Sequence, residues 1–322
     1  MTTGRRTHAL LSIAVAPKTA GDAQRLAHAL QQLIAEDPAL HVQPDEHTGQ
    51  VIIGGMGEQH LEIVLDRLKR EFGVEGAVGK PEVAYKETLT RPADGEMKYV
   101  KQTGGRGEYA HVKLHVFPGE PGSGYIFENE TTDGSIPEKY IKPVDEGIKE
   151  ALTRGVLAGY PIDDVRIELY DGSYHDVDSS ESAFKIAGSM AFQDAAKKAK
   201  PVLLEPVMRV EVVVPIEHTG DVMGNLSSRR GAIRAQEDRG GTQIIQAHVP
   251  LSEMFGYAAD LRSRTKGRGT YAMQLERYQP CPATDDNDGS RDSLVGEPRR
   301  PAPTLRDSRA ALPEPDEDGP RD

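Results

Sequence analysis

The 322-residue sequence has no tryptophan, a single cysteine and few other aromatic residues. One cysteine, Cys281, excludes a disulfide framework within the chain and is typical of a reducing compartment. No apolar run reaches the length of about 18 residues that a membrane helix needs, and residues 1–16 do not have the order of a secretory signal. The sequence therefore predicts a cytoplasmic protein without a membrane segment.

Several motifs of enzymes are also missing. The sequence has no G-x-x-x-x-G-K-[ST] phosphate loop, and Gly76–Pro81 has the wrong spacing for one. Asp221–Gly224 fits D-x-x-G, but that pattern carries no weight without a phosphate loop. H-E-x-x-H, cysteine pairs and G-x-S-x-G are absent as well. We therefore expect no catalytic residue, no metal site and no cofactor in this chain.

Negative charge dominates, with 39 Lys and Arg against 51 Asp and Glu and a net charge of −12. Residues 285–322 hold 11 of the acidic residues and 6 arginines, are rich in proline and have few large apolar side chains. Such a composition predicts disorder, here over residues 279–322. An acidic protein of this kind can bind nucleic acid only through a few local basic loops.

The most informative segment is Lys101–His111, KQTGGRGEYAH. It lies between an expected strand at Met97–Lys101 and another at Tyr109–Phe117, which alternates apolar and polar residues. Glycines at a hairpin tip permit close backbone approach, and Arg106 could meet a phosphate there. A flexible solvated loop explains the composition equally well.

A second loop, Asp171–Glu181, precedes a long expected helix. The spacing of Asp178 and Glu181 is typical of a helix cap, so both carboxylates are expected to be structural. Tyr174 and His175 have no such role, and at a loop tip they could stack on a base or donate to a 2′-hydroxyl. By itself, one exposed histidine is more often inert.

The periodicity predicts an α+β protein with two small ferredoxin-like sandwiches on either side of a larger domain. Residues 1–7 are expected to be frayed. Residues 8–79 form the first sandwich, with strands at His8–Ala16, Leu40–Gln43, Gln50–Gly54 and Val74–Val78 and helices at Asp22–Asp37 and Glu58–Phe72. Residues 204–278 repeat this β-α-β-β-α-β order, with strands at Val207–Pro215, Gly231–Gln236, Thr242–Pro250 and Thr270–Arg277 and helices at Asp221–Arg230 and Ser252–Thr265.

Residues 80–203 differ from both sandwiches. We expect a mostly antiparallel sheet with its helices on one face. Its strands are predicted at Glu82–Thr90, Met97–Lys101, Tyr109–Phe117, Tyr125–Thr131 and Val165–Tyr170, and its helices at Pro143–Arg154 and Ser179–Lys198.

In the third domain, Ser252 is expected to be a helix N-cap.

An ordered set of motifs resembles the C-terminal three domains of bacterial elongation factor G, the ribosomal translocase. They include SIAVAPK at 12–18, GGMGEQHL at 54–61, VGKP at 78–81, GGRG at 104–107, LAGYP at 157–161, GSYHDVDSS at 172–180 and PLSEMFGY at 250–257. The resemblance implies family domains three, four and five for the three predicted domains. The resemblance does not extend to the family's GTPase domain and β-barrel, so we expect a fragment without GTPase activity. GTP and magnesium are cofactors of the full-length family.

The resemblance also implies partners and sites. The partners are the ribosome, at the small-subunit decoding region and the large-subunit factor site, transfer RNA, messenger RNA and a separate GTPase domain; the chain itself is expected to be a monomer. The tip residues implied to bind RNA are Lys101, Gly104, Gly105, Arg106, Gly107, Tyr109, His111, Tyr174, His175 and Asp176. Arg262, Arg264, Lys266 and Arg268 are implied to contact large-subunit RNA, although a solvated charged face explains them as well.

Two other functions are also compatible with the sequence. A stand-alone regulator or decoy would occupy the factor site of the ribosome without driving movement. Central domains of this architecture also occur in small-molecule kinases, but a missing phosphate loop argues against an enzyme, and fold alone does not restore that interpretation.

Overall fold

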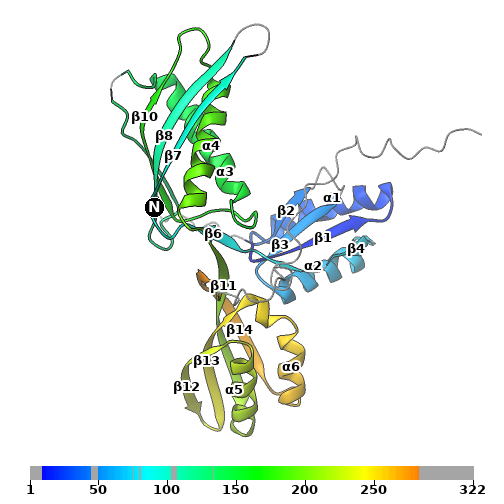
Figure 1. Cartoon of the computed structure of the whole chain (residues 1–322). Coiled ribbons are helices and arrows are strands. Elements are labelled where there is room, and N and C mark those ends of the chain that lie inside the picture. The colour runs from blue at the N-terminus through cyan, green and yellow to red at the C-terminus, as the bar shows by residue number, and fades with distance from the viewer. Residues whose placement is uncertain are drawn as a thin grey trace, which may run out of the picture. The chain divides into compact units, whose positions relative to one another are not determined.

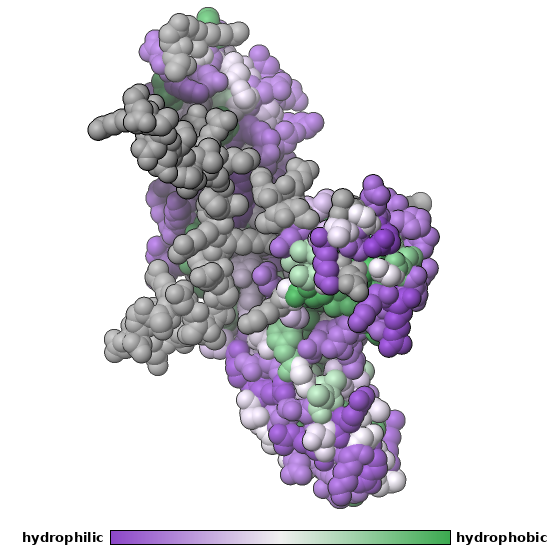
Figure 2. Space-filling view, turned by 90° about the vertical axis from the view of Figure 1, so that its right-hand side faces the viewer, coloured by the Kyte–Doolittle hydropathy of each residue, from purple (hydrophilic) through white to green (hydrophobic). Residues whose placement is uncertain are grey.

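The structure is a computed structural model that describes residues 9–44, 50–74, 76–79, 81–102, 107–132 and 134–282. These residues form three sheets of five, four and five strands, with helices against each. The α+β class predicted from the sequence is confirmed (Figure 1). Hydrophilic residues dominate the face in Figure 2, and hydrophobic residues show only in small areas of it.

The first sandwich has the predicted element order. Its strands pair in the order β2-β3-β1-β4, with β1 antiparallel to both β3 and β4. Side chains of α1 and α2 at helical spacing are buried against this sheet, among them Leu26, Leu61 and Val64. The elements are β1 Leu11–Pro17, α1 Ala20–Glu36, β2 His41–Pro44, β3 Val51–Gly55, α2 Glu58–Arg70 and β4 Gly76–Val78.

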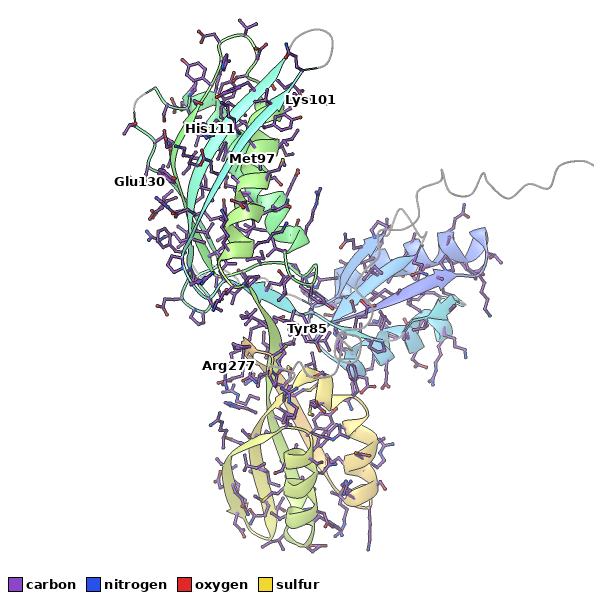
Figure 3. The ribbon with its side chains drawn as sticks, in the orientation of Figure 1. Tyr85, Met97, Lys101, His111, Glu130 and Arg277 are labelled. Carbon is purple, nitrogen blue, oxygen red and sulfur yellow. The ribbon has the colours of Figure 1, made fainter. Side chains whose placement is uncertain are left out.

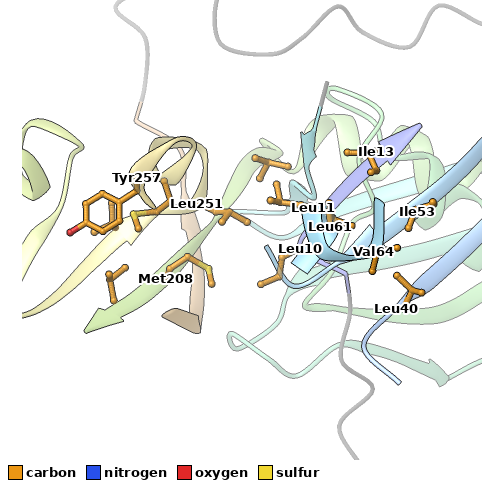
Figure 4. Close-up of a cluster of buried hydrophobic side chains, with 14 of the residues drawn as sticks. Leu10, Leu11, Ile13, Leu40, Ile53, Leu61, Val64, Met208, Leu251 and Tyr257 are labelled. Atoms are coloured by element: carbon orange, nitrogen blue, oxygen red, sulfur yellow. The ribbon is translucent and has the colours of Figure 1, made fainter. Parts of the chain in front are cut away.

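The third domain repeats this topology, with strand order β12-β13-β11-β14. Figure 4 shows side chains from the two sandwich cores, with Leu11 and Ile53 from the first and Met208 and Tyr257 from the third. The elements are β11 Val202–Pro215, the short 3-10 helix η1 Ile216–His218, α5 Thr219–Ser228, β12 Ala232–Arg239, β13 Thr242–Pro250, the 3-10 helix η2 Leu251–Met254, α6 Tyr257–Arg264 and β14 Thr270–Pro280.

Two boundaries in this domain were wrong. Ser252 is not an N-cap, because the expected helix Ser252–Thr265 consists of η2, a break and then α6. Gly256 causes the break: it has a φ of 70°, a left-handed conformation that glycine adopts easily. At the other end, β14 continues past the expected domain boundary to Pro280, and the Cys281 N–H still donates to the Leu203 carbonyl at 2.9 Å.

The central domain has a four-stranded sheet in the order β7-β8-β10-β9. All its pairs are antiparallel except β9 with β10, which α3 connects as a crossover. Helices α3 and α4 lie on one face of the sheet (Figure 1). The alternation in the expected strand Tyr109–Phe117 is confirmed, because Ala110, Val112, Leu114 and Val116 are fully buried. The elements are β7 Ala93–Lys101, β8 Glu108–Pro118, β9 Tyr125–Asn129, α3 Glu138–Arg154, β10 Val165–Ser173 and α4 Glu181–Lys198.

The expected strand Glu82–Thr90 does not belong to this sheet. It consists of β5 Glu82–Val83, which pairs with β1 of the first sandwich, and β6 Lys86–Thr88, which pairs with β11 of the third. The Tyr85 N–H turns back to the Val83 carbonyl at 3.0 Å and separates the two. The extended conformation predicted for Glu82–Thr90 is found in β5 and β6, but the strands with which they pair are set by distant backbone groups.

Helix α3 begins at Glu138, five residues before Pro143, where its start was predicted. Proline at position 143 lacks one N–H donor, yet the helix continues through it. Helices α3 and α4 approach closely at two glycines. A Cβ at Gly147 would clash with the Lys185 carbonyl, and one at Gly188 would lie 2.8 Å from the Val144 carbonyl oxygen. Glycine is needed at both contacts because the two backbones touch.

Glu87 on β6 is fully buried and its carboxylate accepts four backbone hydrogen bonds. The donors are the N–H groups of Val156, Leu157, Ala158 and Tyr160, at 2.8 to 3.1 Å. The main chain of Glu87 also bonds to the carbonyl of Pro161 and the N–H of Asp163. Residues 82–88, which carry β5 and β6, form the linker between the first sandwich and the central domain. One residue of this linker, Glu87, therefore holds loop 155–163 of the central domain while its strand pairs with β11.

Candidate nucleic-acid interface

The two predicted tip loops lie side by side at one end of the central sheet. Strands β7 and β8 pair as far as Lys101 and Glu108, the last described pair before the glycine-rich segment. Next to it, the Tyr109 N–H donates to the Asp178 carbonyl at 2.8 Å, and a Cβ at Gly107 would lie 3.1 Å from the Asp178 carboxyl carbon. Gly104, Gly105 and Arg106 lie outside the described residues.

Ser179 joins the two loops. Its hydroxyl donates to the Tyr109 carbonyl at 2.8 Å and accepts from the His175 N–H at 2.9 Å. The helix cap lies one residue further on, at Ser180, whose hydroxyl accepts from the Ala183 N–H. The predicted capping role of Asp178 was therefore wrong: strand β10 runs on to Ser173 and moves the turn, so that Asp178 serves the neighbouring hairpin instead.

Rings from both loops are in contact at this end. Tyr109 and His175 have ring centroids 4.2 Å apart at an interplanar angle of 57°. The Tyr109 hydroxyl is 2.8 Å from the Ser173 hydroxyl, which is 3.1 Å from Nδ1 of His111. Nε2 of His111 lies 2.8 Å from the Glu96 carboxylate. This network orients Tyr109 and His111, while His175 keeps one side exposed.

The exposed residues of the tip come from both loops. Lys101 stands at the loop end of β7, and Figure 3 shows it with His111 further along β8. On the second loop Tyr174, His175 and Asp176 are exposed, and so is Val177, at 67% of its surface. Val100, at the end of β7, is 61% exposed. The tip thus presents a lysine, a carboxylate, two rings and two aliphatic side chains.

Away from the tip, several basic groups on the helix-free face of the sheet are paired with carboxylates, while the ammonium of Lys98 lies over the Tyr109 ring. His115 lies 2.6 Å from Asp94, and the ammonium of Lys113 lies 3.1 Å from Asp171, whose pKa it lowers. Arg166 contacts both Glu128 and Glu168. The Tyr170 ring stacks on His115, with centroids 4.0 Å apart. Neutralised charges of this kind attract a polyanion weakly, so any RNA contact of this domain is expected at the tip.

The second predicted basic set surrounds the end of α6. Arg262 and Arg264 lie in its last turn, and the chain then turns at Lys266, with a φ of 53°. All four predicted residues are exposed. Arg268 differs from the others because its guanidinium lies 2.8 Å from both Glu217 and His218. The structure therefore places Arg262, Arg264 and Lys266 at exposed positions around the C-terminal end of α6 and engages Arg268 locally.

Sequence reasoning missed two residues that shape the central domain. Ser179 was read as the start of the helix, although its hydroxyl bonds to the main chain of both loops. Glu87 was read as an ordinary strand residue. No local pattern marks either role, because the partners of Ser179 and Glu87 lie up to about 70 residues away in the sequence.

Replacing Ser179 with alanine is expected to loosen the two loops without unfolding the domain. The buried hydroxyl makes two hydrogen bonds, so its loss should cost about 1–2 kcal/mol. The opening free energy that hydrogen exchange reports at the His175 amide should fall by roughly the same amount. Ser182→Ala, on the exposed first turn of α4, is the matched control, and equal exchange in both variants would contradict the role of Ser179.

Comparison with known proteins agrees with this architecture. Three family models match consecutive parts of the chain: Elongation Factor G, domain III, over residues 7–80; Elongation factor G, domain IV, over 81–200; and Elongation factor G C-terminus over 202–288. A crystal structure of a protein from Thermus thermophilus is 42% identical with a TM-score of 0.69, and the match covers 87% of this chain and 42% of that one.

The matched set defines three successive domains of a translation factor, two of them ferredoxin-like. The chain belongs to the elongation factor G family. The matches are to domain III, domain IV and the C-terminus of the family, and the chain spans about two fifths of the solved structure's chain. None of the helices among the described residues is long and apolar enough to cross a membrane.

Proposed function

We propose that this chain is the ribosome-binding part of an elongation factor G-like protein, and that it assists the translocation of transfer RNA and messenger RNA. GTP hydrolysis would come from a domain outside this chain. The observation that carries the proposal is the joining of the two tip loops through Ser179 and the Tyr109–His175 contact. A single RNA duplex can meet both loops only if they lie together.

The chemistry of the tip suits recognition by shape. Any codon can occupy the decoding region, so a translocase must hold the codon–anticodon duplex without base preference. A-form RNA presents a shallow minor groove with 2′-hydroxyls, which backbone amides, His175 and Arg106 could contact in any sequence. Lys101 would add charge for the phosphates. Asp176 would accept a hydrogen bond from a 2′-hydroxyl.

The third domain supplies a second contact in this proposal. Arg262, Arg264 and Lys266 are exposed at the C-terminal end of α6, and we place them against large-subunit RNA at the factor site. Two separate RNA contacts would orient the central domain on the ribosome. We also propose that the chain acts as a monomer in the cytoplasm.

Cosedimentation with ribosomes at low salt tests the proposal, because phosphate contacts are strongest there. His175→Ala and Arg106→Ala should each reduce the pelleted fraction several-fold, about 1 kcal/mol per lost contact. His28→Ala and Arg70→Ala, at exposed positions of the first sandwich, are the matched controls. If the wild-type chain does not pellet at low salt, the proposal fails.

In vitro translation separates assistance from decoy activity. A translocation module should be inactive alone and gain activity when a GTPase partner is added. A decoy should inhibit translation in proportion to its ribosome binding, and no added GTPase domain should relieve that inhibition.

A further inference from the structure

The helix-free face of the third domain's sheet carries a cluster of arginines around one histidine. His248 lies on β13 directly opposite Arg209 of β11, and its ring is 16% exposed. Arg234 of β12 and Arg277 of β14 reach the same ring from the two sides. Figure 3 labels Arg277 on β14. The arginines of this cluster are distinct from the basic turn at the end of α6.

Two guanidinium groups converge on a single nitrogen. Nε of Arg234 and an Nη of Arg277 each lie 3.2 Å from Nδ1 of His248. A neutral imidazole offers one lone pair at that nitrogen, so it cannot fully satisfy both donors. Among the described residues, neither arginine forms an ion pair with a carboxylate. Two like charges are therefore held together without a neutralising partner.

The surroundings of His248 disfavour the charged form of its ring. Burial lowers its pKa, and Arg234 lowers it further, against an opposing effect of Glu276. The nearest carboxylate oxygen of Glu276 is 4.0 Å from Nε2 of His248 and another is 3.7 Å from Nε of Arg209. Glu276 thus serves the third arginine. Arg277 also donates weakly to the Gln279 side-chain oxygen, at 3.4 Å, and the remaining N–H groups of Arg234 and Arg277 stay available to an anion.

A shallow pocket adjoins the cluster. It has a volume of about 300 Å³ and is lined by Arg209, Glu211, Gln246, Ala272, Met273 and Gln274. Amide and guanidinium groups at its wall can hydrogen-bond to ribose or phosphate, while Glu211 would disfavour a phosphate placed directly beside it. An anion is therefore favoured at the Arg234–Arg277 side, and a polar, uncharged group is favoured in the pocket.

We propose that this face binds an RNA strand, with one phosphate between Arg234 and Arg277 and the adjacent ribose over the pocket. Guanidinium pairs bind phosphate in forked geometry, and the anion would supply the acceptors that His248 alone does not. The site rests on the proposed function, since the RNA would be ribosomal. It adds a third contact surface, separate from the tip and from the α6 turn.

The test uses the full chain and a labelled single-stranded uridine oligonucleotide, with binding followed by fluorescence anisotropy across a salt series. The double variant Arg234→Gln/Arg277→Gln should bind about tenfold more weakly and lower the slope of log K against log salt by about 0.7, which is the contribution of one single-strand phosphate contact. The control Arg70→Gln/Arg239→Gln removes the same charge from two exposed, ion-paired arginines. It should change the affinity by no more than a factor of about two and leave the salt slope unchanged.

NMR signals of the His248 ring locate the binding. They should shift on adding the oligonucleotide to the wild-type chain and the control, and stay unmoved in the double variant. Inorganic phosphate is the comparison ligand: a shift with phosphate and none with RNA would overturn the assignment to RNA. Equal RNA affinity of the two double variants would overturn the site. Either failure leaves the ribosome pelleting of the tip variants unaffected, so the proposed function is judged separately.

Discussion

Replacing Glu87 with glutamine is expected to destabilise the chain by about 3 kcal/mol or more, because buried N–H groups lose their acceptor. The carboxylate accepts from Val156, Leu157, Ala158 and Tyr160. A glutamine of the same shape offers one oxygen, and its NH₂ group faces donors. The effect should therefore be large although only one atom changes its chemistry.

Hydrogen exchange at those backbone amides measures the loss directly. Protection should fall by about two orders of magnitude in Glu87→Gln, since about 1.4 kcal/mol corresponds to a factor of ten. Glu82→Gln, at an exposed position of the neighbouring strand β5, is the control and should exchange like the wild type. Unchanged protection in Glu87→Gln would show that water or the backbone can replace the carboxylate.

Gly147→Ala is expected to lower the free energy of unfolding by about 2–3 kcal/mol. A methyl group there would meet the carbonyl of Lys185 on the facing helix, so α3 and α4 would have to separate, and overpacking of this kind costs about 1–3 kcal/mol. Helix propensity alone would favour alanine. Packing should outweigh propensity here because the obstacle is backbone, which moves only with its helix.

Gly224→Ala in α5 is the matched substitution. That glycine is exposed, with nothing within 4 Å of the added methyl, so alanine should stabilise the chain by about 0.5–1 kcal/mol. Urea unfolding of both variants should move the midpoints in opposite directions. If both substitutions stabilise, the close approach of α3 and α4 does not constrain residue 147.

Much of the fold followed from local patterns. The alternation at Ala110–Val116 predicts a strand with one buried face, and all four apolar side chains are buried. The element order of both sandwiches was also predicted correctly, because period and punctuation by glycine and proline are encoded within each segment. Adjacent placement of the tip loops was expected from the resemblance, and the described ends of the two loops are in contact.

What could not be predicted depends on contacts between distant residues. The helix cap at Ser180 instead of Asp178 follows from where β10 ends, and that end is set by pairing with β8. The break at Gly256 was missed because apolar residues on both sides continue the helical period. Glu87 and the Arg234–Arg277 pair belong to the same class, since each takes its meaning from partners on other strands.

The two short strands of the linker affect how the chain can be divided. Because β5 extends the first sandwich and β6 extends the third, a cut before Glu82 removes β5 from the first sheet and a cut after Thr88 removes β6 from the third. The exposed margin of β1 or β11 would then offer unpaired backbone groups to a second molecule, a common cause of self-association. The first sandwich expressed by itself should therefore retain residues 82–83, and residues 86–88 should stay in one piece with the central and third domains.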